Sequence, residues 1–268
     1  MKLATWNVNS LKVRLPHLFT WLEQSPVDVL CLQETKLEDK SFPRAEIEAA
    51  GFHVAYSGQK TYNGVAIVSR FPLADVQAGN PHFADEQKRL IAVTVTAPDQ
   101  APVRVISAYV PNGQAVGSDK YEYKLAWLAG LRRWLQDELA AHPQLAIAGD
   151  YNIAPDDRDV HDPVAWAGQI LCSDDERAAF VALTGLGLAD AFRLFDQPER
   201  VFSWWDYRMM GFRRNHGLRI DHVLLSEALR ARCTACVVDR APRGWERPSD
   251  HAPVIATLAD TPATGDIS

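Results

Sequence analysis

Polar side chains stand at the ends of several apolar, strand-like runs in this sequence. Asn7 lies in TWNVNS, Glu34 in LQETK and Asp150 in GDYNIAP, each where an apolar run gives way to a turn. Comparable positions beside apolar runs are taken by Tyr109, Asn152, Asp221, Asp250 and His251. Since α/β folds place active sites at strand ends, we expect these side chains to share one cleft.

Taken singly, these residues are weak signals, because an Asn after a strand is usually a turn residue and a lone Asp or Glu is usually solvated surface. Together they supply four carboxylates, two amides, one imidazole and one phenol. Oxygen ligands of this kind favour Mg²⁺, with Mn²⁺ as an expected substitute, and no cage of Cys and His indicates zinc. A bound metal can stabilise developing negative charge, and a carboxylate beside it can orient water. The pattern leaves open whether Asp150 or His251 is the base, and whether one or two metals bind.

Nine short β-rich runs and three amphipathic stretches are expected to position these groups. The strand candidates are Lys2–Val8, Asp28–Gln33, Gly64–Ser69, Leu90–Thr96, Val103–Val110, Leu145–Gly149, Arg219–Leu225, Arg232–Val238 and Pro253–Leu258. The helix candidates lie near Val13–Gln24, Ser118–Ala141 and Asp174–Leu183. Helices and strands intermix along the chain, which favours an α/β fold of two packed mixed sheets flanked by helices over a single parallel sheet.

Length and composition predict one domain. The chain has 268 residues, 47% of them hydrophobic, and no apolar run approaches the roughly 18 residues that a membrane span needs. Met1–Asn7 lacks a signal-peptide pattern and the four cysteines are scattered, so we expect a cytoplasmic protein that contacts no membrane. We assign residues 1–258 to a single catalytic domain and the small, polar segment 259–268 to a disordered tail.

The net charge of −6 argues at first against a nucleic-acid partner. The charge is uneven, however. Residues 200–251 hold ten Arg against six Asp or Glu, so this stretch carries +4 and the remainder −10. A carboxylate-rich metal site beside a basic patch produces such a distribution, although exposed arginines are common in any protein.

The motifs resemble those of the exonuclease III family of abasic endonucleases, within the endonuclease/exonuclease/phosphatase superfamily. They follow the family order over nearly the whole chain: TWNVNS at 5–10, LQETK at 32–36, TYNGVAIVSR at 61–70, SAYVPNG at 107–113, GDYNIAP at 149–155, FSWWDYR at 202–208, GLRIDHVLLS at 217–226 and SDHAPV at 249–254. FSWWDYR followed by GLRID points to the exonuclease III branch, whereas the GDxN and SDH patterns mark only the superfamily. Two features depart from the family pattern: Tyr151 stands where Phe is expected, and the loop Trp166–Asp175 resembles nothing that we can assign.

The resemblance implies a four-layered α/β sandwich and a Mg²⁺-dependent DNA repair nuclease. The implied partner is double-stranded DNA with 3′ ends or abasic sites, cut by a monomer acting as a 3′→5′ exonuclease, an abasic-site endonuclease or both, with 3′-phosphatase activity. The balance among these activities is left open by the sequence.

The resemblance also implies a role for each motif residue. Asn7 and Glu34 would hold Mg²⁺, and the residues around the metal and the scissile phosphate would be Asp150, Asn152, Asp250 and His251. Asp150 would orient or deprotonate water, His251, held by Asp221, would contact a phosphoryl oxygen, Asn152 would stabilise the transition state, and Tyr109 would lie near the phosphate or the leaving group. Arg208, Arg213, Arg214 and Arg219 cluster between two motifs and Lys36 follows Glu34, which predicts that this group contacts DNA phosphates. The other expected DNA contacts are Asn112, Trp204, Leu218 and Ile220. Trp204, Leu218 and Ile220 would line an apolar pocket for a sugar that lacks its base.

Three alternatives account for part of the pattern. An inositol-polyphosphate phosphatase or a sphingomyelinase would share the catalytic centre, but the aromatic residues and arginines of 202–220 suit a DNA backbone better than a soluble headgroup. A secreted DNase I-like nuclease would also fit the centre, although no signal peptide is visible. A non-catalytic DNA-binding module would not need the complete set of catalytic residues.

Overall fold

A computed structural model describes residues 1–260 of the protein. The predicted tail, 259–268, lies outside the described residues except for its first two positions. The amide of Ala259 donates to the carbonyl of Arg232 (2.8 Å), so the ordered chain continues past residue 258. Among residues 1–260, no helix has both the length and the apolar character needed to cross a membrane.

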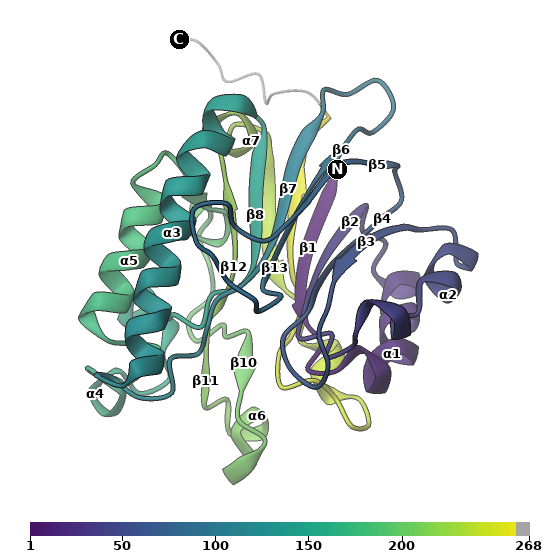
Figure 1. Ribbon diagram of the computed structural model, residues 1–268. Coiled ribbons are helices and arrows are strands. Elements are labelled where there is room, and N and C mark those ends of the chain that lie inside the picture. Colours follow the sequence, from purple (N-terminus) through teal and green to yellow (C-terminus); the bar gives the residue numbers. More distant parts are fainter. Residues whose placement is uncertain (261–268) are drawn as a thin grey trace.

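Two six-stranded mixed β-sheets form the centre of the molecule (Figure 1). The first sheet has the order β13 (Cys233–Val238), β14 (Val254–Leu258), β1 (Lys2–Asn7), β2 (Val29–Gln33), β4 (Val65–Ser69) and β3 (His53–Ser57). The second has the order β5 (Leu73–Ala78), β6 (Leu90–Val95), β7 (Val103–Tyr109), β8 (Leu145–Asp150), β12 (Asp221–Leu225) and β9 (Ala189–Asp190). Each sheet contains one parallel pair, β1 with β2 and β7 with β8, and the remaining pairs are antiparallel.

Helices cover the outer face of each sheet and complete four layers (Figure 1). A parallel pair needs a crossover connection, and α1 (Leu11–Gln24) and α3 (Asp119–Ala141) provide the two crossovers. α2 (Arg44–Ala49) lies with α1, and α5 (Asp174–Thr184) lies with α3. The predicted four-layered α/β sandwich is therefore confirmed.

Shorter elements connect these layers. They are the strands β10 (Trp204–Trp205) and β11 (Gly217–Leu218), the helices α4 (Pro163–Trp166), α6 (Gly211–Arg214) and α7 (Glu227–Arg230), and the 3₁₀ turns η1 (Asp39–Ser41), η2 (Asp157–Asp159), η3 (Ala191–Leu194), η4 (Arg208–Met210) and η5 (Ala241–Gly244). β10 and β11 pair with each other and carry α6 on the loop between them, which extends from one end of the molecule (Figure 1).

Three apolar clusters hold the layers together. Leu3, Val29 and Val105 belong to the cluster between the two sheets. Trp127 and Trp134 of α3 lie in the cluster beneath the second sheet, while Trp6 and Trp21 lie in the one between the first sheet and α1. The central strands are buried on both faces, which explains why they appear in the sequence as continuous apolar runs.

All nine predicted strands are present, most within a residue or two of the expected bounds. The prediction missed β3 and β5, which lie at the sheet edges, and the two-residue strands. β5 is largely exposed and its pairing with β6 shifts register between Ala74 and Gln77, so it lacks an apolar run.

Strand direction brings the polar strand ends to one edge of the sandwich. Asn7 at the end of β1 pairs with Gln33 at the end of β2. In the second sheet, Asp150 pairs with both Tyr109 and Asp221. Because the two sheets pack face to face, these ends form a common site.

Candidate active site

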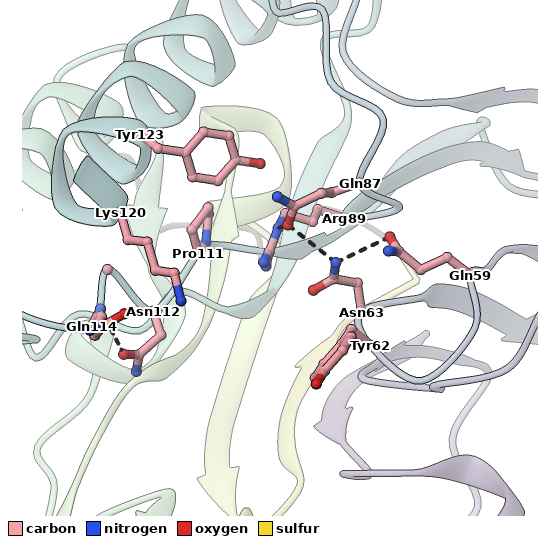
Figure 2. A pocket seen from close by; sticks show the side chains of 11 residues that line it. Gln59, Tyr62, Asn63, Gln87, Arg89, Pro111, Asn112, Gln114, Lys120 and Tyr123 are labelled. Carbon is pink, nitrogen blue, oxygen red and sulfur yellow. Dashed lines mark hydrogen bonds between the residues drawn. The ribbon is translucent and has the colours of Figure 1, made fainter. Parts of the chain in front are cut away.

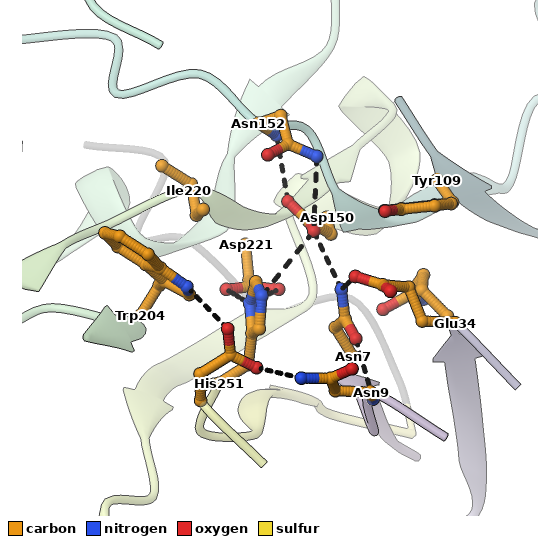
Figure 3. Close-up of polar contacts among 12 residues, drawn as sticks. Asn7, Asn9, Glu34, Tyr109, Asp150, Asn152, Trp204, Ile220, Asp221 and His251 are labelled. Carbon is orange, nitrogen blue, oxygen red and sulfur yellow. Dashed lines mark hydrogen bonds and ion pairs between the residues drawn. The ribbon is translucent and has the colours of Figure 1, made fainter. Parts of the chain in front are cut away.

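The predicted catalytic side chains converge between the ends of the two sheets (Figure 3). Glu34 follows β2 in a left-handed conformation with φ of 52°, and Asn152 follows β8 with φ of 50°. Left-handed backbone is uncommon for residues other than glycine and often marks a functional turn. These turns direct Glu34 and Asn152 towards Asp150.

Glu34, Asp150 and His251 form a candidate metal cluster. One ligand atom from each lies within 4.8 Å of the others, and no other such group of three or more occurs in the part of the chain that the structure describes. Asn7 Nδ2 donates to Glu34 Oε1 and to Asp150 Oδ2, both at 2.9 Å. Two convergent carboxylates suit a hard divalent cation, so the donor set fits the metal implied by the family. As a metal ligand, Asn7 would have to turn its side-chain oxygen towards Glu34 and Asp150. In this structure that oxygen accepts from the main-chain amide of Asn9, and a flip of the side-chain amide would bring it to the metal position.

His251 is held from behind by Asp221. Its Nδ1 donates to Asp221 Oδ2 at 2.9 Å, and its Nε2 lies 3.7 Å from Asp150 Oδ2. Burial alone would lower the pKa of His251, but the negative charges of Asp221 and Asp150 outweigh it and raise that pKa to about 10. Burial raises the pKa of Asp150 to about 7, against the opposing charge of His251.

Ser203 fixes Asp221 in turn. Its hydroxyl donates to Asp221 Oδ2 at 2.6 Å and accepts from the amides of Asp221 and Ile220. Ser203 is fully buried. The result is a continuous chain of hydrogen bonds from Ser203 through Asp221 to His251.

Two amide side chains and a phenol lie on the side of Asp150 that faces away from His251. Asn152 Nδ2 donates to the carbonyl of Val110 (3.0 Å), and Asn112 Nδ2 donates to Asn152 Oδ1 (3.1 Å). Burial, and then the charges of Glu34 and Asp150, raise the pKa of Tyr109 well above its ordinary value. The hydroxyl of Tyr109 therefore stays protonated and is available as a hydrogen-bond donor.

Asp250 lies outside the metal cluster in this structure. Its Oδ2 accepts from Trp204 Nε1 and its Oδ1 accepts from Asn9 Nδ2, both at 2.9 Å. Lys36 Nζ donates to Asn9 Oδ1 (2.5 Å) and pairs with Glu34 (2.8 Å). Asp250, Asn9 and Lys36 therefore form a polar border that joins Trp204 to Glu34.

The predicted apolar residues form one wall of the site. Leu218 and Ile220 are buried, and Trp204 packs against them partly exposed. The loop that the sequence left unassigned contributes Leu171, which is buried in the same cluster and adopts φ of 73°. The loop thus packs against this wall.

The predicted basic residues divide into two groups. Arg208, Arg213 and Arg214 are exposed around η4 and α6, although Arg208 pairs with Asp206 (2.7 Å). Arg219 is 1% exposed and pairs with Asp159 and Asp190, so the prediction that it contacts DNA phosphates with the other arginines was wrong. Its side chain turns inwards, where two carboxylates compensate the buried guanidinium.

A cleft of about 660 Å³ opens beside Asn112 (Figure 2). Asn112 and Arg89 belong to its lining, and the Arg89 guanidinium lies 4.8 Å from the centre of the Tyr109 ring. The other lining residues are Gln59, Tyr62, Asn63, Gln87, Pro111, Gly113, Gln114, Lys120 and Tyr123. The lining contains amides and two cations but no carboxylate, in contrast to the net negative charge of the chain.

Three residues of this site were not predicted from the sequence. Ser203 and Asn9 lie within motifs, FSWWDYR and TWNVNS, so membership of a motif was the available signal. Lys124 lies on a helix without any motif, and only the folded structure places it under the site loops.

Comparisons with known proteins agree with this geometry. The model of the Endonuclease/Exonuclease/phosphatase family matches residues 4–251. Exodeoxyribonuclease III of Haemophilus influenzae is 36% identical over 265 residues, covering 96% of this chain and 99% of that protein. A Neisseria 3′ phosphatase bound to a product DNA hairpin shares 47% identity with a TM-score of 0.93, covering 96% of this chain and 99% of that one. An AP endonuclease from Archaeoglobus fulgidus shares 38% identity with a TM-score of 0.90, covering 96% and 99%.

The convergent carboxylates and the His251–Asp221 pair are the kinds of group that a metal-dependent phosphohydrolase site needs. The chain belongs to the endonuclease/exonuclease/phosphatase family. The predicted membership of its exonuclease III branch, and with it the predicted enzyme class of nucleases, is confirmed.

Proposed function

We propose that this protein is a Mg²⁺-dependent DNA repair nuclease that hydrolyses phosphodiester bonds of duplex DNA at 3′ ends and at abasic sites, with 3′-phosphatase activity. The observation that carries the proposal is the convergence of Glu34, Asp150 and His251, with Asp221 behind His251. The cytoplasmic location and monomeric state predicted from the sequence remain parts of this proposal.

The metal would be held by Glu34 and Asp150, with Asn7 beside them. When bound, it would supply Lewis-acid stabilisation of the charge that develops on the phosphoryl oxygens. Lys36, paired with Glu34 on the outer side, adds positive charge near the same position. Asp250 would act from a second layer of hydrogen bonds, through Asn9 and Trp204.

The remaining polar groups divide the hydrolytic work. Both ring nitrogens of His251 face carboxylate oxygens, which suits a protonated ring that donates to a phosphoryl oxygen. Asp150 is then the group suited to orient the attacking water. Tyr109 offers a donor on the other side of Asp150, where the pentacovalent phosphate and the leaving oxygen need one. Asn152 lies on the same side, and its amide would donate to the phosphate in place of its present contact with Asp150.

DNA would cross the site between two positive surfaces. On one side is the cleft with Arg89 and Lys120, whose carboxylate-free lining suits a phosphodiester backbone (Figure 2). On the other side stand Arg208, Arg213 and Arg214, and the apolar wall lies beside them. A sugar without its base leaves the helix at low cost and would pack against Trp204.

The test is an assay of purified protein with and without EDTA on three substrates: recessed-end duplex DNA, duplex with one abasic analogue, and duplex with a 3′-phosphate. We expect Mg²⁺-dependent turnover, restored by Mg²⁺ or Mn²⁺ after chelation. Asp150→Asn should abolish it, whereas Asp157→Asn, which changes an exposed acid that pairs with Arg177, should not. Undiminished cleavage in EDTA, or no cleavage of any of the three DNA substrates, would contradict the proposal.

A further inference from the structure

Lys124 on α3 is a fully buried lysine. Its ammonium donates to the carbonyl of Asn112 (3.2 Å), to the carbonyl of Asn152 (2.7 Å) and to the carboxylate of Glu176. The three protons of the ammonium are thus all used. Each of these carbonyls belongs to a loop that carries one of the two amide side chains of the site, Asn112 or Asn152.

Glu176 connects this ammonium to a third loop. Its carboxylate is fully buried and accepts from the amide and the hydroxyl of Ser173 (3.1 and 2.7 Å), which caps α5. Ser173 closes the loop that places Leu171 in the apolar wall. Three loops of the site therefore meet at Lys124 and its partner.

The close packing at Gly113 shows how tightly the first loop lies on the lysine. Gly113 has φ of +91°, and a Cβ there would lie 2.9 Å from Ile170 Cδ1 and 3.1 Å from Lys124 Cδ. On the cleft side, the side chains of Asn112 and Asn152 are joined by their own hydrogen bond of 3.1 Å. The two amides are thus linked in front by side chains and behind by Lys124.

We propose that Lys124 is a positioning residue that fixes Asn152 and Asn112 against Asp150 by holding the main-chain carbonyls of their loops. The inference rests on the proposed function, because it concerns turnover at the same site. Asn152 has φ of 50°, a conformation that needs support from its surroundings. A contribution to stability does not by itself explain why a charged lysine stands here, since replacing a buried ion pair with uncharged residues often leaves the free energy of folding unchanged. Burial lowers the pKa of Lys124, and the charge of Glu176 opposes that effect.

The test compares two variants that differ only at Lys124. Glu176→Gln keeps the lysine and one acceptor oxygen at position 176, while Lys124→Met with Glu176→Gln removes both charges. We expect Glu176→Gln to retain turnover within about three-fold. The double variant should lose about 30-fold in kcat, because a small misplacement of catalytic groups slows the chemical step by about this factor. Its KM for duplex DNA should change by less than about three-fold.

The matched control is Arg104→Met with Glu138→Gln. Arg104 and Glu138 form another buried ion pair (2.7 Å) that also involves α3, at the opposite end of the sandwich. This control should lose as much thermal stability as the double variant without losing kcat.

Amide hydrogen exchange supplies a readout that does not depend on activity. Peptides covering 110–118 and 150–156 should exchange at least about ten-fold faster in the Lys124→Met double variant than in Glu176→Gln, and should be unchanged in the control. Faster exchange there would support the inference even if the proposed DNA substrate were wrong. Wild-type kcat in the double variant, an equal loss in the control, or a double variant that fails to fold where Glu176→Gln folds would each overturn the positioning role.

Discussion

Among single residues, Glu34 is the one whose substitution tests the metal alone, because it is a proposed metal ligand without a proposed role in proton transfer. Glu34→Gln changes charge at nearly constant volume, so we expect thermal stability to stay within a few degrees while kcat falls about 100-fold, as expected when several kcal/mol of charge stabilisation is lost. Raising Mg²⁺ or Mn²⁺ should recover part of it. Glu38→Gln is the matched control, since Glu38 also pairs with a lysine two positions on, at the surface. Near-wild-type turnover of Glu34→Gln at low Mg²⁺ would remove Glu34 from the site.

Ser203 tests whether the orientation of Asp221 matters. Ser203→Ala leaves Asp221 Oδ2 without its 2.6 Å donor, and a hydrogen bond to a charged group contributes about 1.5–3 kcal/mol, so we expect kcat to fall at least about ten-fold. Ser203→Thr should restore most of the turnover. Ser226 is the control: its buried hydroxyl also accepts from an amide (Leu145, 3.0 Å) and donates to a carbonyl (Pro143, 2.8 Å). If Ser226→Ala slows turnover equally, the effect of Ser203 is one of stability alone.

At the scale of elements, the hairpin of β10 and β11 with its α6 tip is the segment expected to lie along DNA. Each phosphate contact contributes about 0.9 to the slope of log affinity against log salt. Arg213→Ala with Arg214→Ala should therefore flatten that slope by up to about two units. Arg132→Ala with Arg133→Ala makes the same charge change on the outer side of α3 and should leave the slope unaltered. Equal slopes for both pairs would place α6 off the DNA.

The loop between α4 and α5 packs against the apolar wall through Leu171. Leu171 fills space beside Leu218 and Ile220 with φ of 73°, a conformation in which glycine is unstrained. Leu171→Gly should raise cleavage at an abasic analogue relative to exonuclease activity by about ten-fold, the scale at which apolar pockets discriminate. Trp204→Ala should change the ratio in the opposite direction. The two rates are measured on one preparation, and a ratio unchanged in both variants would show that this wall does not select the sugar.

Across the whole molecule, the sequence predicted what depends on buried strands and contiguous motifs. Central strands such as β2 and β8 are buried on both faces and therefore appear as apolar runs. The groups now seen around Asp150 were predicted because each lies at the end of such a run. Arg219 was misplaced because its carboxylate partners, Asp159 and Asp190, are distant in sequence. For the same reason neither the wall position of Leu171 nor the role of Lys124 was visible before the loops were placed together.

The network around Arg219 gives a pH-dependent prediction for the stability of the whole molecule. His222, which is buried beside it, donates from Nε2 to the carbonyl of Ile153 (2.9 Å) and accepts at Nδ1 from Arg219 (3.0 Å). Burial, and then the charge of Arg219, lower the pKa of His222 from 6.5 to about 4. The unfolded chain therefore takes up the proton first, so this contribution to stability is present above pH 6.5 and is lost as the pH falls towards 4.

His222→Gln keeps a donor for Ile153 and an acceptor for Arg219 but does not titrate. Between about pH 7 and pH 5 the free energy of unfolding should fall in both proteins, and the fall should be about 2 kcal/mol smaller in His222→Gln than in the wild type. Each unit of pKa shift corresponds to about 1.4 kcal/mol. Urea unfolding at the two pH values measures the difference. His53→Gln, an exposed change on β3, should behave as the wild type does. Parallel losses in the wild type and His222→Gln would mean that His222 is not held neutral in the folded protein.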